Sequence, residues 1–188
     1  MPEQKKPAIN PVRILFVINP KSGHGGEKNL KNLISEQSKS GKFDYQIIVM
    51  SGDDKERISN SINQYKPDIV AAAGGDGTIN LMAGILANTG IPLAIIPQGS
   101  ANGMAKELHI PGKIESAFEI LIKGKKQAID LIRINERICI HLADVGLNAR
   151  VVKRFENDVK RGILTYAKHL FGEMFLLKKY VFNITYDG

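Results

Sequence analysis

The sequence predicts an α/β domain with a parallel sheet and three layers, followed by the beginning of an antiparallel, β-rich domain. Short apolar runs alternate with segments of helical periodicity, and three of those runs lead into glycine-rich turns. From about Asp130 the strand candidates follow one another closely, as in a hairpin. We therefore expect an α/β domain over residues 1–128, with a loose tail at 1–11, and an incomplete β-rich domain over residues 129–188.

Four strands are expected in the α/β part, at residues 12–18, 43–50, 68–73 and 92–97. Their continuous apolar character is typical of strands that helices cover on both faces. Helices are expected at residues 26–39, 54–65, 78–88, 101–107 and 114–122. Because strands and helices alternate, the strands should run parallel, and ligands should bind beyond their carboxyl ends.

In the rest of the chain, strand candidates no longer alternate regularly with helices. "IDLIRIN" and "RICIHLADVGLNARVV" are strand candidates that "NER" joins as a hairpin, and a helical stretch over residues 150–179 precedes a last strand candidate, "YVFNITYDG". One helix and one strand do not complete an antiparallel layer. We therefore expect the chain to be part of a longer protein.

Composition is that of a globular protein, with 43% hydrophobic and 24% charged residues. No run approaches the roughly 18 apolar residues of a membrane span, and the N-terminus lacks the apolar core of a signal peptide, so a cytoplasmic location is expected. The single cysteine, Cys139, excludes an intramolecular disulfide and a cysteine-based metal cluster, and we expect it in the core.

The net charge of +7 is concentrated in a basic stretch over residues 150–179. Such a stretch suits an anionic membrane surface, and it equally suits a solvated helix face. Few aromatic residues are interleaved and no nucleic-acid-binding motif is present, so we expect no nucleic acid partner. The basic residues are Arg150, Lys153, Arg154, Lys160, Arg161, Lys168, Lys178 and Lys179.

The first expected strand leads into "NPKSGHGG", residues 19–26. Its glycines allow backbone N–H groups to face an anion, the following helix adds its N-terminus, and Lys21 adds a cation. Neither a Walker A spacing nor a dinucleotide fingerprint is present. The turn is interpreted as a phosphate-binding loop or as an ordinary turn with a capping serine.

The third expected strand leads into "GGDGT", residues 74–78. Its glycines allow a ligand close to the main chain, and Thr78 is expected to cap the next helix. A carboxylate beside phosphates is tolerable where Mg²⁺ neutralises both, so Asp76 is a candidate metal ligand. Alternatively, Asp76 accepts a proton from an attacking hydroxyl, or forms a hydrogen bond within its own turn.

The fourth expected strand leads into "PQGSANG", residues 97–103. Its serine, asparagine and glycines could bind ribose, phosphate or the attacking substrate. Since three such turns follow parallel strands, they should converge at one edge of the sheet.

These three motifs, in this order, resemble the catalytic domain of the diacylglycerol kinase family, which includes sphingosine, ceramide and bacterial lipid kinases. "IDLIRIN" and "HLADVGLNARVV" resemble the opening of that family's second domain. The resemblance implies an ATP-binding domain and transfer of the γ-phosphoryl group of ATP to a lipid hydroxyl, with Mg²⁺. It also implies a cytoplasmic protein attached peripherally to an anionic membrane, and we expect that the chain can form a homodimer.

The resemblance assigns Asp76 as catalytic residue and metal ligand. The nucleotide contacts that it implies are Asn19, Pro20, Lys21, Ser22, Gly23, Ser51, Gly74, Gly75, Asp76, Gly77, Thr78, Asn80, Ser100 and Asn102.

The chain departs from the family pattern at four places. Asn148 stands where many members have an acidic residue in the second domain. Leu81 replaces a frequent glutamate, and Gly103 and Met104 replace a frequent aspartate and phenylalanine. The distal Asp-Gly-Glu motif of bacterial members has no safe equivalent in Asp187. An NAD kinase, which shares "GGDGT", and a nucleotide-binding module without turnover therefore remain alternatives.

Overall fold

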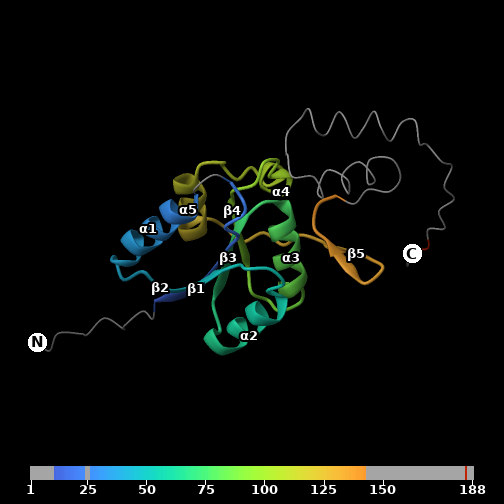
Figure 1. Ribbon diagram of the computed structural model, residues 1–188, viewed down its shortest axis with the longest axis horizontal. Helices are drawn as coiled ribbons and strands as arrows, with labels where there is room; N and C mark the ends of the chain where they lie inside the picture. The colour runs from blue at the N-terminus through green and yellow to red at the C-terminus, as the bar shows by residue number, and fades with distance from the viewer. Residues whose placement is uncertain (1–10, 24–25, 143–184, 186–188) are drawn as a thin grey trace, which may run out of the picture. The chain divides into compact units, whose positions relative to one another are not determined.

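The computed structural model, in which residues 11–23, 26–142 and 185 are described, contains a four-stranded parallel sheet (Figure 1). The strands are β1 (Val12–Ile18), β2 (Phe43–Val49), β3 (Ile69–Gly74) and β4 (Leu93–Pro97), in the order β2-β1-β3-β4. The predicted α/β class and the four predicted strands are confirmed.

The strand order has a consequence for ligand binding. β1 lies between β2 and β3, so the chain leaves β1 toward one edge of the sheet and leaves β3 toward the other. In open parallel sheets, ligands bind at the carboxyl ends of strands where the order reverses in this way. The turns after β1 and β3 flank that point.

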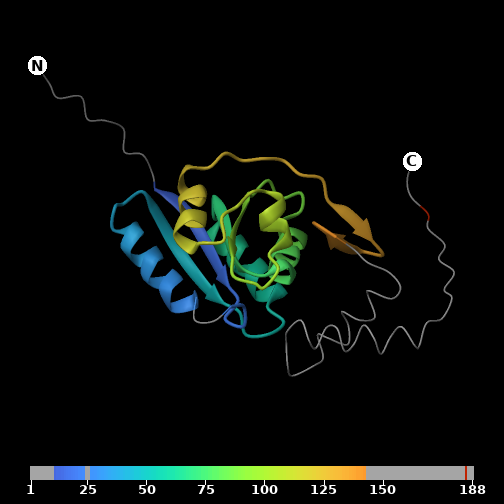
Figure 2. The ribbon, with the colours of Figure 1, turned by 90° about the horizontal axis from the view of Figure 1, so that it is seen from above.

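Helices cover both faces of the sheet (Figures 1 and 2). On one face, α1 (Gly26–Ser38) and α5 (Ile114–Lys123) bury the side chains of Ile14, Phe16 and Ile18, and Phe16 stacks on Phe118 with ring centroids 6.0 Å apart. The other face carries α2 (Lys55–Tyr65), α3 (Asp76–Leu86) and the short α4 (Gly103–Glu107). The apolar strands are thus buried on both sides, which confirms three layers.

The predicted hairpin forms at the predicted turn. β5 (Ile132–Ile134) pairs antiparallel with β6 (Arg137–Cys139) across Asn135 and Glu136, whose φ values of +45° and +66° are those of a tight type I′ turn. The hairpin contacts α3, where the Ile140 amide donates to Asn80 Oδ1 at 3.1 Å. Cys139 is only half-buried, because it lies in this two-stranded pair rather than in the main sheet.

Several predictions fall outside the described residues. These are the basic stretch over residues 150–179 with its helical periodicity and, apart from Thr185, the last strand candidate. The predicted domain division between residues 128 and 129 stays a prediction. Among the helices that the structure describes, none is long and apolar enough to span a membrane.

Candidate functional site

The turns after β3 and β4 touch through two glycines. A Cβ on Gly99 would lie 2.5 Å from Gly75 Cα, a distance that real side chains do not adopt. Main chain therefore packs directly on main chain here, which requires glycine at Gly99. The close approach confirms that these two motifs meet at one edge of the sheet.

The turns after β1 and β3 are joined by a side-chain hydrogen bond. Asn19 Nδ2 donates to Thr78 Oγ1 at 2.9 Å, and Asn19 Oδ1 accepts the Lys21 amide at 3.0 Å. Thr78 is 5% exposed, and a Cβ on Gly74 would lie 2.5 Å from its hydroxyl. Asn19 and Thr78 therefore hold the first two turns together across the switch point.

Thr78 does not cap α3, so that prediction was wrong. The helix begins at Asp76 with Gly75 as its N-cap, and the Gly75 carbonyl oxygen accepts the amides of Thr78 and Ile79 at 3.0 and 3.1 Å. Thr78 therefore lies within the first helical turn, and its hydroxyl accepts a hydrogen bond from Asn19 in another turn instead of one from the backbone of α3.

The Asp76 carboxylate joins the second and third turns. Its Oδ2 accepts the Gly103 amide and its Oδ1 accepts the Met104 amide, both at 3.0 Å. These amides belong to the first turn of α4, where a carboxylate supplies missing acceptors and complements the helix dipole. From the sequence, a hydrogen bond within its own turn is one alternative for Asp76. The carboxylate instead accepts these two hydrogen bonds from α4.

The third turn is closed by its asparagine. Asn102 adopts a left-handed conformation, with φ +49°, and its carboxamide exchanges hydrogen bonds of 2.7 and 2.8 Å with the backbone of Gly99. Ser100 is exposed at the tip. The three turns therefore form one connected group, which we call the three-turn cluster: residues 19–23, 74–78 and 98–104.

Some polar groups of the three-turn cluster have no hydrogen-bond partner within the described residues. In the part of the chain that the structure describes, the Asp76 and Gly77 amides at the N-terminus of α3 donate no hydrogen bond. Lys21 is exposed in the first turn. Unpaired amides at a helix N-terminus favour an anion.

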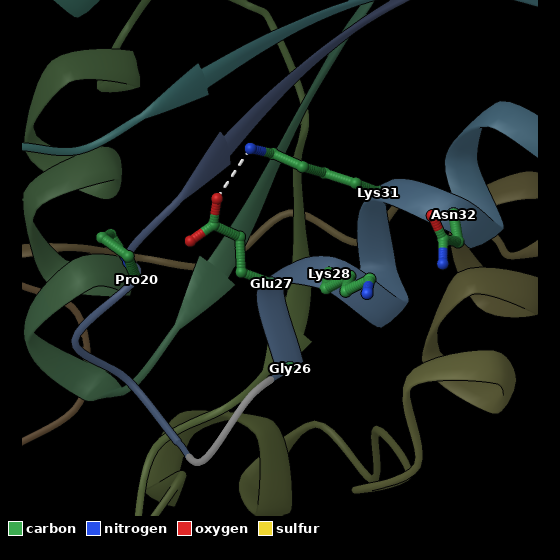
Figure 3. Close-up of a pocket in the computed structure, with 6 residues that line it drawn as sticks. All are labelled: Pro20, Gly26, Glu27, Lys28, Lys31 and Asn32. Carbon is green, nitrogen blue, oxygen red and sulfur yellow. Dashed lines mark hydrogen bonds and ion pairs between the residues drawn. The ribbon is translucent and has the colours of Figure 1, made fainter.

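A pocket of about 500 Å³ adjoins the first turn (Figure 3). Pro20 and the N-terminal turns of α1 line it, and Lys31 forms an ion pair of 2.6 Å with Glu27 at its wall. The remaining lining residues are Gly26, Lys28 and Asn32. The pocket thus offers space beside the first turn, and basic side chains line it.

The diacylglycerol kinase catalytic domain family matches residues 13–134, a range that includes the five described helices and all of the four-stranded sheet except Val12. This chain belongs to that family. It is 30% identical over 182 residues to a diacylglycerol kinase of Staphylococcus saprophyticus, which covers 93% of this chain and 59% of the relative. A Pectobacterium atrosepticum protein named "Probable lipid kinase YegS-like" is 32% identical over 176 residues, covering 90% of this chain and 58% of that protein.

A solved structure supports the same assignment. The crystal structure of a diacylglycerol kinase from Bacillus anthracis is similar with a TM-score of 0.57 and 28% identity, over 67% of this chain and 45% of that chain. The chain therefore spans less than two thirds of the length of each of these relatives.

Neighbouring side chains explain why position 103 is a glycine and not the aspartate that is frequent in the family. A Cβ there would lie 2.7 Å from His141 Nε2 and 3.6 Å from Asp76 Oδ1. The aspartate frequent in the family would therefore require the imidazole to move, and it would bring a second carboxylate toward Asp76. His141, which the sequence motifs did not single out, takes that space at the end of the hairpin.

The turn after β2 is organised by a residue that sequence reasoning missed. Asp54 is 2% exposed, and its Oδ2 accepts the amides of Ser51 and Gly52 at 2.6 and 3.1 Å. Arg57 Nε donates to Asp54 Oδ1 at 2.8 Å, and its Nη2 donates to the Val49 carbonyl oxygen at 2.7 Å. Burial opposes ionisation, but the two amides and the guanidinium outweigh it, so the pKa of Asp54 lies below its ordinary value.

Ser51 lies in this turn, which is not one of the three turns of the cluster. Its amide and hydroxyl both bond to Asp54, the hydroxyl at 3.3 Å, and its side chain is exposed. Asn80, another predicted contact, lies on α3 and accepts the Ile140 amide. Nucleotide contact by either residue stays a prediction.

The Mg²⁺ that the family implies can be tested against the residues present. Asp76 is the one carboxylate of the three-turn cluster, and the described residues contain no group of three side chains that could hold a metal ion. Mg²⁺ commonly binds through one or two carboxylates together with phosphate oxygens and water. Asp76 fits such a role for an ion that arrives with a nucleotide.

Proposed function

We propose that this chain is the nucleotide-binding part of an ATP-dependent lipid kinase, which transfers the γ-phosphoryl group to the hydroxyl of a diacylglycerol-like or sphingoid lipid. Kinases of the family use ATP. The observation that supports the proposal is the three-turn cluster. Its turns are joined by hydrogen bonds at the switch point, and within the described residues the first amides of α3 donate no hydrogen bond. That arrangement fits a polyphosphate.

Catalysis of phosphoryl transfer depends mainly on positioning the reactants and on stabilising the charge of the transition state. Each residue of the site therefore has a simple proposed role. The Asp76 and Gly77 amides bind phosphate oxygens, and Lys21 offsets their charge. Asn19 and Thr78 hold the first two turns at a fixed separation. Mg²⁺, held by Asp76, would supply neutralisation of the charge that develops on the phosphates.

Asp76 is also the proposed acceptor of the proton of the attacking alcohol. Each carboxylate oxygen already accepts one amide hydrogen bond, which keeps the group in place and leaves further lone pairs on both oxygens. This role and the metal role both require the ionised form.

The basic stretch over residues 150–179 is proposed to face an anionic membrane, from which a lipid substrate is taken up. A homodimer is proposed as well. Retention of the chain on phosphatidylglycerol vesicles but not on RNA, and its mass in solution, would test these two proposals.

The central experiment is a kinase assay with a panel of lipid alcohols, applied to this chain and to a version extended at its C-terminus. We expect MgATP-dependent phosphorylation of diacylglycerol or a sphingoid base by the extended version. Phosphorylation of NAD without any lipid product would instead support an NAD kinase. MgATP binding by calorimetry with no transfer in either version would support a binding module.

A further inference from the structure

Gln98 has buried hydrogen-bonding groups that the described residues do not satisfy. It is 8% exposed, and neither its Oε1 nor its Nε2 has a hydrogen-bond partner there. Its backbone is fixed, because the Gln98 amide donates to the Gly74 carbonyl oxygen at 2.9 Å. Burying a carboxamide without partners destabilises a protein, so a partner is expected in the functional state.

The side chain of Gln98 lies against the N-terminus of α1. A Cβ on Gly26, the first residue of this 13-residue helix, would come within 2.8 Å of Gln98 Nε2. A Cβ on Gly23 would come within 2.8 Å of the Gln98 carbonyl oxygen. The absence of a side chain at Gly23 leaves room for the main chain of Gln98. Its absence at Gly26 leaves room for the carboxamide at the end of the helix, where an anion is favoured.

We propose that Gln98 is a nucleotide-binding residue whose Nε2–H group donates a hydrogen bond to a phosphate oxygen at the N-terminus of α1. The inference rests on the nucleotide site proposed above and adds a residue to it. An uncharged donor is suited to this position, since it can be buried without a counter-ion while the site is empty. Gln98 then destabilises the ligand-free protein and strengthens binding of the nucleotide.

The test is the substitution Gln98→Met, which keeps the length of the side chain and removes its polar atoms. We expect a higher Tm for the ligand-free protein, together with a Kd for MgATP that rises about tenfold to a hundredfold. The Kd for inorganic tripolyphosphate should rise by a similar factor. Gln64→Met, at an exposed position on α2, is the matched control and should change none of these values.

The outcomes separate this inference from the proposed function. If the wild-type chain fails to bind MgATP and tripolyphosphate, both are overturned. If the wild type binds and Gln98→Met binds equally well, or if only MgATP binding weakens, the phosphate contact is overturned alone. A lower Tm with unchanged affinity would show that Gln98 only supports the turn.

A second measurement needs no variant. The assigned side-chain NH₂ signals of Gln98 in a ¹⁵N–¹H spectrum of the wild type should shift when tripolyphosphate is added. Signals that stay in place while the α3 N-terminal amides shift would also overturn the contact.

Discussion

Two kinds of turn lie at the carboxyl edge of the sheet, and they use their polar groups differently. In the turn after β2, the buried carboxylate of Asp54 accepts neighbouring amides and pairs with Arg57. In the three-turn cluster, the Gln98 carboxamide and the first amides of α3 have no partner within the described residues. A turn that satisfies its own polar groups supports the fold, whereas a turn that leaves them unpaired is suited to a ligand.

Asp76 combines the two uses, because its carboxylate satisfies two amides of α4 and is also the group proposed to hold Mg²⁺. Its substitution should have the largest effect on activity. In Asp76→Asn, we expect phosphoryl transfer by the extended protein to fall by at least about 100-fold, since the amide can neither hold Mg²⁺ in the same way nor accept a proton. The loss of stability should be only about 1–2 kcal/mol, as for a weakened helix cap.

Asp68→Asn is the matched control for this variant. Asp68 also accepts a backbone amide, that of Arg13 at 2.8 Å, but it precedes β3 at the opposite edge of the sheet. The control should lose a similar amount of stability and no activity. Unchanged transfer by Asp76→Asn in a radiolabelled lipid assay would restrict Asp76 to capping α4.

A smaller effect than that of Asp76→Asn is expected at the contact between the turns. In Gly99→Ala, the new Cβ must displace Gly75, so we expect the Kd for MgATP to rise roughly tenfold and stability to fall by about 1–3 kcal/mol. Gly112→Ala, at a position with no neighbour within 4 Å, should leave affinity unchanged. Calorimetry measures the Kd, and thermal unfolding measures the stability. Wild-type affinity in Gly99→Ala would show that the two turns can separate without loss of the site.

The fold was predictable because its signals are local. The apolar run of residues 12–18 coincides with β1, and the hairpin forms at Asn135 and Glu136 as the close spacing of its strands indicated. The start of α3 was placed two residues late, because threonine is a frequent N-cap and the sequence does not show that its hydroxyl bonds to Asn19.

The candidate site was predictable in its motifs but not in its internal contacts. Asp76 was singled out by its glycine neighbours, yet its hydrogen bonds to α4 join positions 27 and 28 residues apart. Gln98 was passed over, although a polar residue directly after an apolar strand and before glycine was a usable signal. Asp54 gave no signal, because its burial depends on Arg57 and on two neighbouring amides that only the folded turn brings together.

The smallest effect on ligand binding is expected in the turn after β2. In Asp54→Asn, we expect Tm to fall by about 5–10 °C, because a buried carboxylate with several donors is replaced by an amide. The Kd for MgATP should change less than about threefold, since no group of the three-turn cluster bonds to Asp54. Asp53→Asn, at the exposed neighbouring position, is the control and should change neither value. A loss of affinity as large as that of Gly99→Ala would instead support the prediction that Ser51 contacts the nucleotide.

The stability effect of Asp54 should also depend on pH. Because its pKa in the folded protein lies below the ordinary value of 3.8, the ionised carboxylate stabilises the fold fully above that value. The contribution is lost as the pH falls through the lowered pKa, and the asparagine variant has no such group to protonate. In urea unfolding, the difference in stability between wild type and Asp54→Asn should be constant from neutral pH down to about pH 5 and should shrink below 3.8. A difference that stays constant down to pH 2 would show that the hydrogen bonds of this turn do not favour the charged form.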